Sequence, residues 1–533
     1  MSAETAIPIV VGVTGHRAVP EKDRAAISAA VREELKKLVA LCPHSPFIML
    51  NSLAEGGDLL CADAAEELGI PLIAVLPRPL EDYQGDFSES AKTRLKHHCA
   101  RAEAVFTAPM MEPLPPEGST RSFRFRQAGL YVAEHSHVLL ALWDGGPGTE
   151  AACGTAETVD FALNGSCSTS LGLSPRSGAN EAVIHIFTPR GEASEEAAGT
   201  VHVLGNWEAG SDLLRRTDDF NSGARKATPE ASRLPEGAGD DNVLCRMERV
   251  SATAGQLSRQ YARRFRRVLA LLAVAAALLT FAFLLYDEAQ AIWMILVCGV
   301  MLLAAWGCRH YAARSDCHRR YLEYRALAEC LRVQTWLRYA GSRVQAARLL
   351  SCTQQEETAW VLAALCALSI GKEPETKHGI RSCWIDDQRE YHRQAVKRAE
   401  KKLGVSENTV RIALILSVVL YLSAVGFELL CGGLFFRPIF PITDTELCRT
   451  VLKILLGTIS AATLFVSNYY GRLSLPRTLS DHQRLERFYG RMSALIERYG
   501  QTEELLTLLA REELTENGNW CSYQRDNRPD ISL

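Results

Sequence analysis

The chain reads VLALLAVAAALLTFAFLLY over residues 268–286 and AIWMILVCGVMLLAAWG over residues 291–307, without a charged residue in either run. Only residues 287–290 separate the two runs. Because a helix rises about 1.5 Å per residue, each run nearly crosses a hydrocarbon core of about 30 Å. Core helices of a large soluble protein are the alternative, but such helices rarely run this long without a polar face. The stretch therefore predicts a hairpin of two membrane-spanning helices.

A second apolar hairpin follows, with spans expected at 412–430 and at about 451–470. Glu428 and Lys453 lie near the outer ends of these spans, where we expect snorkelling or mutual pairing. Arginines flank the first hairpin on both sides, whereas its acidic tip carries no Lys or Arg; they are Arg259, Arg263, Arg264, Arg266, Arg267, Arg309, Arg314, Arg319 and Arg320. The positive-inside rule then places both termini and residues 308–411 in the cytoplasm. The sequence predicts a multi-pass protein of the inner (cytoplasmic) membrane.

The net charge and the cysteine content of the 533-residue chain argue against some classes of protein. Its net charge of −3 provides no basic excess to neutralise phosphates, which argues against a nucleic-acid-binding protein. Its 16 cysteines include no C-x-x-C pair, a pattern typical of free thiols in a reducing compartment rather than of a zinc site. The first residues lack the basic region of a cleavable signal peptide. We therefore expect the N-terminal part to stay in the cytoplasm.

Residues 7–190 alternate short apolar runs with helical stretches, which is the pattern of a parallel α/β sheet. The predicted strands cover residues 7–13, 47–50, 71–76, 104–106, 138–143 and 183–187. Helices are predicted over 21–41, 59–68 and 155–163. We therefore expect a Rossmann-like head in front of an all-helical membrane part.

Polar and glycine-rich loops follow four of these strands. In an open parallel sheet, ligands bind beyond the carboxyl ends of the strands. Glycines there let the backbone approach a ligand, and helix N-termini offer N–H groups to phosphate. Arg17 is expected to pair with phosphate, whereas Glu55, Asp58 or Asp144 would accept hydrogen bonds from ribose hydroxyls. The candidate ligand-binding residues are Thr14, Gly15, His16, Arg17, Glu55, Gly56, Gly57, Asp58, Pro77, Asp144, Gly145, Gly154, Thr155 and Glu157.

We do not predict that the histidines bind a metal ion. His97, His98 and Cys99 are adjacent on a basic helix, so we expect them to fan around it and to make a poor metal cage. His135 and His137 lie just before a strand, and nothing supplies two further ligands at a suitable spacing. No metal site is therefore expected.

Three motifs of the head resemble the SLOG superfamily of Rossmann-like domains, which bind nucleotides or nucleotide-derived signals. They are VTGHR at 13–17, AEGGD at 54–58 and the pair LWDG at 142–145 with GTA at 154–156. The resemblance covers residues 7–190 and implies a nucleotide-derived ligand, of cyclic-nucleotide or ADP-ribose type. Some relatives are LOG phosphoribohydrolases, whose P-G-G-x-G-T-x-x-E loop ends in a catalytic Glu. Two alignments put Ala152 or Thr158 at that position, so the resemblance favours a binding module without catalytic residues.

We predict four segments along the chain. Residues 1–190 form the nucleotide-binding head, and residues 191–245, which show little apolar periodicity, form a partly flexible linker. Residues 246–400 hold the first pair of spans, and residues 401–533 hold the second. A helix is expected to run from Asn242 into the first span, and further long helices are expected over 314–339, 383–402, 481–499 and 503–514.

The two hairpins, the long helix after the first of them and the stretch WIDDQ at 384–388 with Tyr391 and His392 resemble the SLATT family. SLATT domains are two-span effector modules that accompany nucleotide-sensing domains in bacterial conflict systems. The joint resemblance implies a sensor–effector of antiphage defence. In it, a nucleotide second messenger acts on a homo-oligomer in the lipid bilayer and triggers membrane disruption or pore formation. A membrane-tethered nucleotide hydrolase and a nucleotide-regulated channel or transporter are the alternatives.

Overall fold

The computed structural model describes residues 5–116, 118–147, 154–165, 182–190, 196–228, 234–235, 238–288, 291–374, 376–431, 444–472 and 475–527. The chain forms two compact units, which we call the sheet unit and the helical unit. The sheet unit consists of Met1–Leu257, Glu323–Ile380 and Gln501–Cys521. The helical unit consists of Ser258–Leu322, Arg381–Gly500 and Ser522–Leu533. Each unit is therefore assembled from three separated segments of the chain.

A seven-stranded sheet forms the centre of the sheet unit, in the order β4-β3-β2-β1-β5-β6-β7. The strands are β1 (Ile9–Gly15), β2 (Phe47–Asn51), β3 (Leu72–Leu76), β4 (Ala104–Thr107), β5 (Val138–Trp143), β6 (Ala182–Phe187) and β7 (Val201–Gly205). Neighbouring strands are parallel except for the edge strand β7, which runs antiparallel to β6. The prediction of a mainly parallel, Rossmann-like sheet in the N-terminal part is confirmed.

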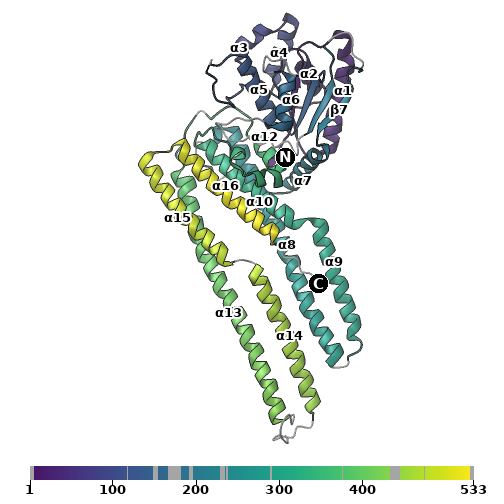
Figure 1. The fold of residues 1–533 in the computed structure, drawn as a ribbon, viewed down its shortest axis with the longest axis vertical. Helices are drawn as coiled ribbons and strands as arrows, with labels where there is room; N and C mark the ends of the chain where they lie inside the picture. The colour runs from purple at the N-terminus through teal and green to yellow at the C-terminus, as the bar shows by residue number, and fades with distance from the viewer. Residues whose placement is uncertain are drawn as a thin grey trace. The chain divides into compact units, whose positions relative to one another are not determined.

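Helices cover both faces of this sheet and make three layers (Figure 1). One face packs against α1 (Arg24–Leu41), α2 (Gly57–Glu67), α4 (Glu89–Arg101) and α7 (Trp207–Ala224). The other face packs against α5 (Arg121–His135), α6 (Thr155–Asn164) and α12 (Ala359–Leu368). Along β1, Ile9 and Val11 belong to the first core and Val10 to the second, because successive side chains point to opposite faces. A strand buried on both faces therefore reads as an almost continuous apolar run.

The stretch 191–245, expected to be a linker, contributes β7 and α7 to the sheet unit. Polar side chains as well as apolar ones hold α7 in place. Asn221 Oδ1 accepts a hydrogen bond from the Ile7 amide, and its Nδ2 donates to the Ile7 carbonyl, both at 2.8 Å. Leu214 supplies a buried apolar contact to the core. Because bonds from side chain to backbone replace part of the apolar stripe, hydrophobic periodicity alone does not reveal this helix.

The helix α12 reads AWVLAALCAL and falls in the predicted membrane segment 246–400, but it packs in the sheet unit. Ala367 and the following Ile370 join the core between the sheet, α5 and α6. Ten residues rise only about 15 Å, too little to cross a hydrocarbon core. This short, fully apolar helix is therefore a core helix.

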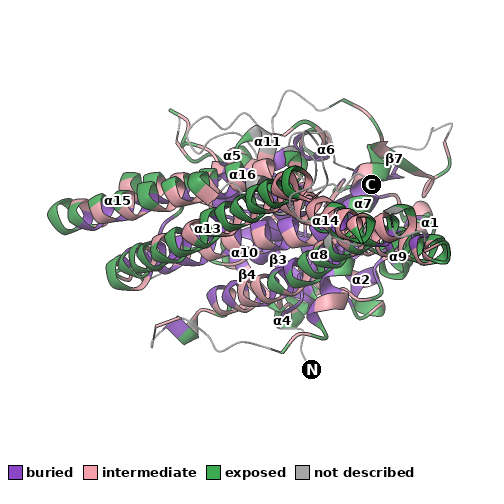
Figure 2. Ribbon diagram, turned by 90° about the horizontal axis from the view of Figure 1, so that it is seen from below, coloured by how far each residue is buried: buried purple, intermediate pink, exposed green. Residues whose placement is uncertain are grey.

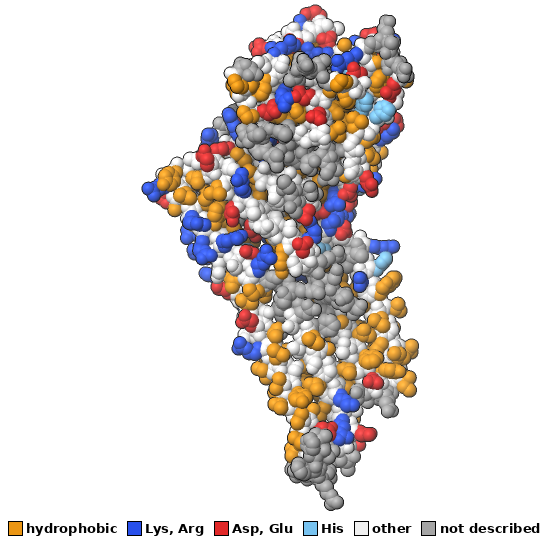
Figure 3. Space-filling model, viewed as in Figure 1, with side chains coloured by type: hydrophobic (Ala, Val, Ile, Leu, Met, Phe, Trp, Pro, Cys, Tyr) orange, Lys and Arg blue, Asp and Glu red, His pale blue; other side chains and the backbone are white. Residues whose placement is uncertain are grey.

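Four long helices carry the apolar runs predicted as spans: α8 (Asn242–Glu288), α9 (Met294–Ser315), α13 (Asp387–Leu430) and α14 (Thr445–Arg472). All four are long and apolar enough to cross a membrane, judged by length and composition. Large apolar side chains lie exposed along them, with exposed fractions of 73% for Leu296 and 69% for Leu303 (Figure 2, Figure 3). Soluble monomers rarely expose continuous apolar surface of this kind. These helices indicate a membrane-associated protein.

Further helices and turns complete the two units. They are α3 (Leu80–Tyr83), α10 (Cys317–Tyr339), α11 (Cys352–Glu357), α15 (Leu475–Tyr499), α16 (Glu503–Asp526), a π-helical turn over Arg381–Asp386 and 3-10 turns at Glu21–Asp23, Gln84–Asp86, Ala238–Asp240 and Ala346–Leu349. The long helices predicted for the C-terminal half are confirmed, with one break at Asp316, where φ is +49°. That left-handed residue ends α9 and separates it from α10.

Within the helical unit, α13 packs against both α14 and α15. The ring of His392 stacks on Tyr489 with 5.5 Å between the ring centres. At the other end of α13, Arg449 of α14 donates two hydrogen bonds to the Glu428 carboxylate, at 2.6 and 2.7 Å. Glu428 is therefore paired with Arg449, whose guanidinium matches a carboxylate with two parallel donors.

Candidate functional site

The order of the strands marks one place at which neighbouring loops diverge. β1 lies between β2 and β5, so the chain leaves β1 toward one edge of the sheet and later enters β5 on its other side. Open α/β sheets bind ligands in the crevice at such a switch point, beyond the carboxyl ends of the strands. The loops after β1, β5 and β6 therefore define the candidate site.

A charged cluster, which we call the His16 group, joins these three loops. His16 Nε2 lies 3.1 Å from the Asp144 amide nitrogen and 3.1 Å from the Asp144 carboxylate. Arg190 Nε lies 3.0 Å from Asp144 Oδ2 and 3.1 Å from His16 Nε2. The Gly146 amide donates to Asp144 Oδ1 at 3.1 Å. The structure thus brings together two predicted site residues, His16 and Asp144, and adds Arg190.

Burial sets the protonation of the His16 group. It lowers the pKa of His16 below its ordinary value, against the opposing effect of the Asp144 hydrogen bond, so the ring is neutral at neutral pH. Burial alone would raise the pKa of Asp144, but the Gly146 amide, His16 and Arg190 outweigh it and lower that pKa. Arg190 is 52% exposed although it is paired with Asp144. Its guanidinium therefore has donors that can reach a second anion.

A second cluster, which we call the Phe125 group, lies around the residue that follows His16. The Arg17 guanidinium carbon lies 5.2 Å from the centre of the Phe125 ring. That of Arg121 lies 5.4 Å from the same centre, and Tyr83 packs edge-on against the ring at 5.8 Å. Two cations therefore flank one aromatic ring, an arrangement that cation–π attraction stabilises.

Asp86 connects the Phe125 group to the end of β3. Its carboxylate lies 3.0 Å from a guanidinium nitrogen of Arg121 and accepts a hydrogen bond from Arg78 at 2.6 Å. Arg78 directly follows Pro77, a predicted site residue that is buried at the end of β3. Pro77 therefore lies at the carboxyl edge of the sheet, as predicted. The positive charge there belongs to the next residue, Arg78.

The glycines of the first two loops serve chain packing. A Cβ on Gly56, whose φ is +96°, would lie 2.3 Å from the Arg17 carbonyl oxygen. Gly15 and Gly57 face each other, and a Cβ on Gly15 would lie 3.0 Å from Gly57 Cα. The Gly57 amide also donates to the His16 carbonyl at 2.9 Å. The packing of α2 against β1 therefore accounts for all three glycines without a ligand.

The carboxylates of the loop before α2 bind within the protein. Asn51 donates to the Asp58 carbonyl at 2.8 Å, and the buried Asp58 Oδ2 accepts from the Ala54 amide at 3.2 Å. Burial raises the pKa of Asp58 to about 7. Glu55 accepts a hydrogen bond from the Ser88 hydroxyl at 2.6 Å, at the start of α4. Both side chains therefore shape the loop, and neither is left exposed and unpaired for a ribose.

The remaining predicted residues lie in β1, in the loop after β5 and at the start of α6. Thr14 lies in β1, opposite Ala141 of β5. Gly145 has a φ of +74°, and Gly154 caps the N-terminus of α6, where an added Cβ would meet no atom within 4 Å. Thr155, the first residue of α6, is buried. Among the described residues, no atom therefore crowds the position of Gly154, at a helix start whose first amides have no partner within the helix.

Of the two positions aligned with the catalytic Glu of the LOG enzymes, the structure describes Thr158. Thr158 is buried, and its hydroxyl donates to the Gly154 carbonyl at 3.4 Å. Ala152 lies outside the described residues. Glu157, out of register with that Glu, forms an ion pair with Arg126. Its carboxylate is therefore held by a salt bridge.

The predicted set of ligand-binding residues lacks six residues of the site: Arg78, Tyr83, Asp86, Arg121, Phe125 and Arg190. The first three lie in the segment that follows β3. Arg190 follows β6 within three residues, so the rule that selected the other loops also covers it. Arg121 and Phe125 belong to RSFRFR at the start of α5, a helix that was not predicted. Arginines alternating with phenylalanines at a helix start are the signal that identifies them.

The histidines differ from expectation. His97 and His98 do not fan apart, because Glu66 of α2 lies close to both rings. His135 and His137 bond to the main chain: His135 Nδ1 lies 2.9 Å from the Tyr131 carbonyl oxygen, and His137 Nδ1 accepts from the Val10 amide at 3.1 Å. The latter two are therefore structural.

Searches against protein-family models and against curated proteins returned no match for this chain. The geometry of the carboxyl edge and the composition of the long helices are the observations from which we argue a function.

Proposed function

We propose that the sheet unit binds a nucleotide-derived anion, of cyclic-nucleotide or ADP-ribose type, at the carboxyl edge of the sheet. The charge beside the switch point carries this proposal. The His16 and Phe125 groups together hold the guanidinium groups of Arg17, Arg78, Arg121 and Arg190 against the carboxylates of Asp86 and Asp144. The negative charges near these guanidinium groups are those of Asp86, Asp144 and, beside Arg17, Asp58, whose pKa burial raises to about 7. The four positive charges still exceed them, and this excess suits phosphate. The Phe125 ring adds a flat apolar surface for a base.

Binding without turnover is the favoured form of this function. The one described carboxylate next to the aligned catalytic position, that of Glu157, is paired with Arg126. Hydrolysis of a nucleoside monophosphate is the second candidate. It is favoured by Asp58, because a pKa of about 7 suits a general base at neutral pH.

Replacing Arg17 with Ala tests the binding site. The side chain is exposed, and its loss removes a charge-assisted contact worth about 1.5–3 kcal/mol, so affinity should fall roughly tenfold or more. Calorimetry of the full chain in detergent, with ADP-ribose and cyclic nucleotides as probes, measures the change. Arg24→Ala is the matched control, since Arg24 is an exposed arginine of α1 that pairs with Glu21 at 2.8 Å. Equal affinities of the two variants for every probe that the wild type binds would place the site elsewhere.

The same titrations separate binding from hydrolysis. A binding module returns the probe unchanged after incubation. Free base released from a nucleoside monophosphate by the wild type, and not by Asp58→Asn, would establish the second candidate instead.

We further propose that ligand binding drives the four long helices to permeabilise the membrane. Helices α8 and α10 run unbroken from the sheet unit into the helical unit, and they connect the two parts of the chain without a flexible break. A ligand can act through them only if it binds the active arrangement better than the resting one. Two spans per hairpin enclose no wide aqueous path, so the active form is a homo-oligomer. By resemblance, the setting is bacterial antiphage defence.

Liposomes that contain the full chain test this output. Added ligand should release ions or dye and shift the protein to larger assemblies, and Arg17→Ala should prevent both effects. Leakage that ignores the ligand would favour a constitutive channel or transporter. Absence of leakage from ligand-saturated wild type would leave a tethered enzyme as the better account.

The proposed orientation in the inner membrane places both termini and residues 308–411 in the cytoplasm. Arginines beside the spans support it, and the Arg449 at an outer end is neutralised by Glu428. Cysteine accessibility after residues 289 and 440 should report the outer side. A cytoplasmic signal at either point would contradict four spans.

A further inference from the structure

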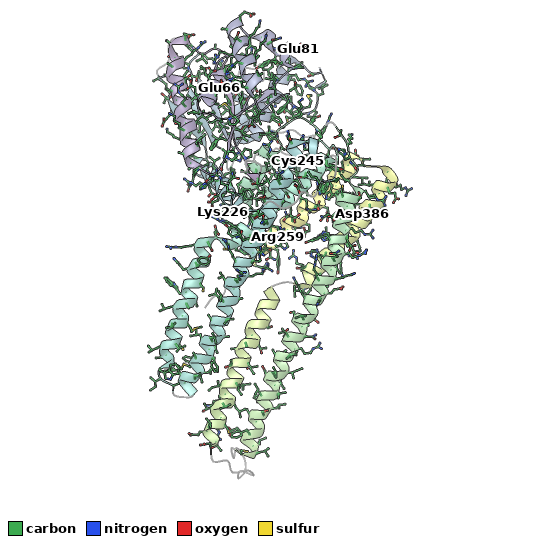
Figure 4. All side chains as sticks on the ribbon, turned by 180° about the vertical axis from the view of Figure 1, so that it is seen from behind. Glu66, Glu81, Lys226, Cys245, Arg259 and Asp386 are labelled. Atoms are coloured by element: carbon green, nitrogen blue, oxygen red, sulfur yellow. The ribbon has the colours of Figure 1, made fainter. Side chains whose placement is uncertain are left out.

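A cluster of metal-ligand type lies where α2 and α4 end side by side in the sheet unit. His97 Nε2 lies 2.9 Å from Glu66 Oε2, and His98 Nδ1 lies 3.7 Å from the same oxygen. One ligand atom from each of the three residues lies within 4.8 Å of the others. Figure 4 labels Glu66 on the sheet unit. One carboxylate oxygen is therefore the common neighbour of two imidazole nitrogens.

Neighbouring side chains orient two of these three ligands. His98 is 3% exposed, and its other ring nitrogen, Nε2, lies 2.7 Å from Asp63 Oδ1. Arg94 in turn binds the second oxygen of Asp63. Arg101 Nε lies 2.8 Å from Glu66 Oε1 and leaves Oε2 toward the histidines. A carboxylate behind a histidine is the usual support of a metal-bound imidazole, because it fixes the tautomer and the ring orientation.

The distances suit a small tetrahedral ion. Ligand atoms about 2.0–2.2 Å from zinc in a tetrahedron lie about 3.3–3.6 Å apart. The two distances to Glu66 Oε2, 2.9 and 3.7 Å, bracket that range. His97 is 51% exposed on the surface, so its ring can turn to complete the geometry. Small side-chain movements therefore suffice to admit the ion.

The backbone also favours a cation here. Glu66 lies in the last turn of α2, and both histidines lie in the last turns of α4. The carbonyl ends of two helices carry partial negative charge, which attracts cations. The three ligands therefore lie in a field of favourable sign, although Arg94 and Arg101 offset part of it.

We propose that Glu66, His97 and His98 bind a divalent transition-metal ion, zinc by preference, with Asp63 supporting His98. Two imidazoles and one carboxylate are ligands that suit zinc, and three protein ligands leave a coordination position for water. The site is separate from the carboxyl edge, because Asp58 lies in the first turn of α2 and Glu66 in its last, about 12 Å further along the helix. A bound ion joins the last turns of α2 and α4 and stabilises the sheet unit by mass action.

Metal titration of the full chain tests the site. The protein is purified in detergent through a tag without histidine and is titrated with Zn²⁺ by calorimetry and with Co²⁺ by visible absorption. His97→Gln and Glu66→Gln should each weaken binding more than tenfold, and Asp63→Asn should weaken it about ten- to hundredfold. Zn²⁺ should also raise the unfolding temperature of the wild type and not that of His97→Gln.

His202→Gln is the matched control. His202 is an exposed histidine of β7 that is paired with a single carboxylate, that of Glu196, so its loss should leave zinc affinity unchanged. Because the chain carries 16 cysteines, the Co²⁺ spectrum must show nitrogen and oxygen ligation rather than a thiolate charge-transfer band. The proposal is overturned if His97→Gln and Glu66→Gln bind Zn²⁺ as tightly as His202→Gln does, or if the only Co²⁺ signal is that of thiolates. No nucleotide enters the titration, so its result is independent of the proposed ligand.

Discussion

Leucine, isoleucine and valine fill the interior of the sheet unit, whereas the same residue types lie exposed along α8, α9, α13 and α14 (Figure 2). Ile9 and Leu50 are fully buried by the layers of helices around the sheet, while Leu303 is 69% exposed. In the sheet unit, protein atoms exclude water from these side chains. In the helical unit, another apolar medium must do so. Burial in the structure, and not apolar composition alone, distinguishes a core element from a membrane element.

Breaking a buried charge pair in the sheet unit should have the largest effect. Arg348 donates to Glu134 of α5 at 2.6 Å, and both side chains are less than 5% exposed. Arg348→Ala leaves a buried carboxylate without this partner and should destabilise the sheet unit by about 3–5 kcal/mol. Urea unfolding of the full chain in detergent, followed by tryptophan fluorescence, measures the loss.

Two further variants sharpen that measurement. Replacing both partners with Met should restore much of the stability, because a buried ion pair contributes little beyond a well-packed apolar pair. Arg24→Ala removes an exposed pair and should cost less than about 1 kcal/mol. A loss as small for Arg348→Ala as for Arg24→Ala would show that this interior is open to water.

An arginine introduced at positions of similar exposure should have different effects in the two units. Leu278 in α8 is 49% exposed and Val39 in α1 is 41% exposed. Leu278→Arg should cost about 2.5–3.5 kcal/mol at the centre of a span and reduce the protein retained in alkali-washed membranes. Val39→Arg faces water and should change neither retention nor stability beyond about 0.5 kcal/mol. Equal retention of both variants would mean that Leu278 does not face lipid.

The buried carboxyl of Asp58 should make the stability of the sheet unit depend on pH. Its pKa is 3.8 in an unfolded chain and about 7 in the fold, so the folded state holds the proton more tightly. The contribution of Asp58 to stability is therefore greatest at low pH and falls as pH rises from about 4 to about 7, by roughly 2 kcal/mol between pH 5 and pH 7. Asp58→Asn should remove this dependence. Parallel pH profiles of the unfolding temperature for wild type and variant would contradict it.

The sequence predicts the fold best where burial is complete on both faces. β1 and β5 are central strands whose apolar runs predict buried strands. The predicted bounds of β5 agree with the structure at both ends. β7 is an edge strand without a buried residue, and Asn221 anchors the neighbouring α7 through hydrogen bonds. Neither element has the dense apolar pattern on which the prediction depends. The predicted segment 246–400 was drawn around two spans, and it also contains α12, which packs in the sheet unit.

The sequence predicts which residues lie at the carboxyl edge of the sheet, but it does not predict the contacts that their side chains make. His16 and Asp144 follow from strand ends, because parallel strands bring their carboxyl ends to one edge. A sequence does not show that Gly56 is pressed against backbone or that Glu55 is bound to Ser88. It also does not place Phe125 beside Arg17, since that contact joins a helix and a loop far apart in the chain. Whether these residues hold a ligand stays a prediction.

The division of the sheet unit into three segments has a consequence for the order of synthesis. Arg332 donates to Glu513 at 2.7 Å and Gln354 donates to the Leu514 carbonyl at 2.9 Å, so α16 completes the unit. About 140 residues separate Ile380 from Cys521, which corresponds to roughly 7–30 s of translation at about 5–20 residues per second. During that time α13 and α14 leave the ribosome. The sheet unit is therefore finished only after the last apolar hairpin has emerged, and a nascent chain stalled before residue 501 carries all four long helices without a complete sheet unit.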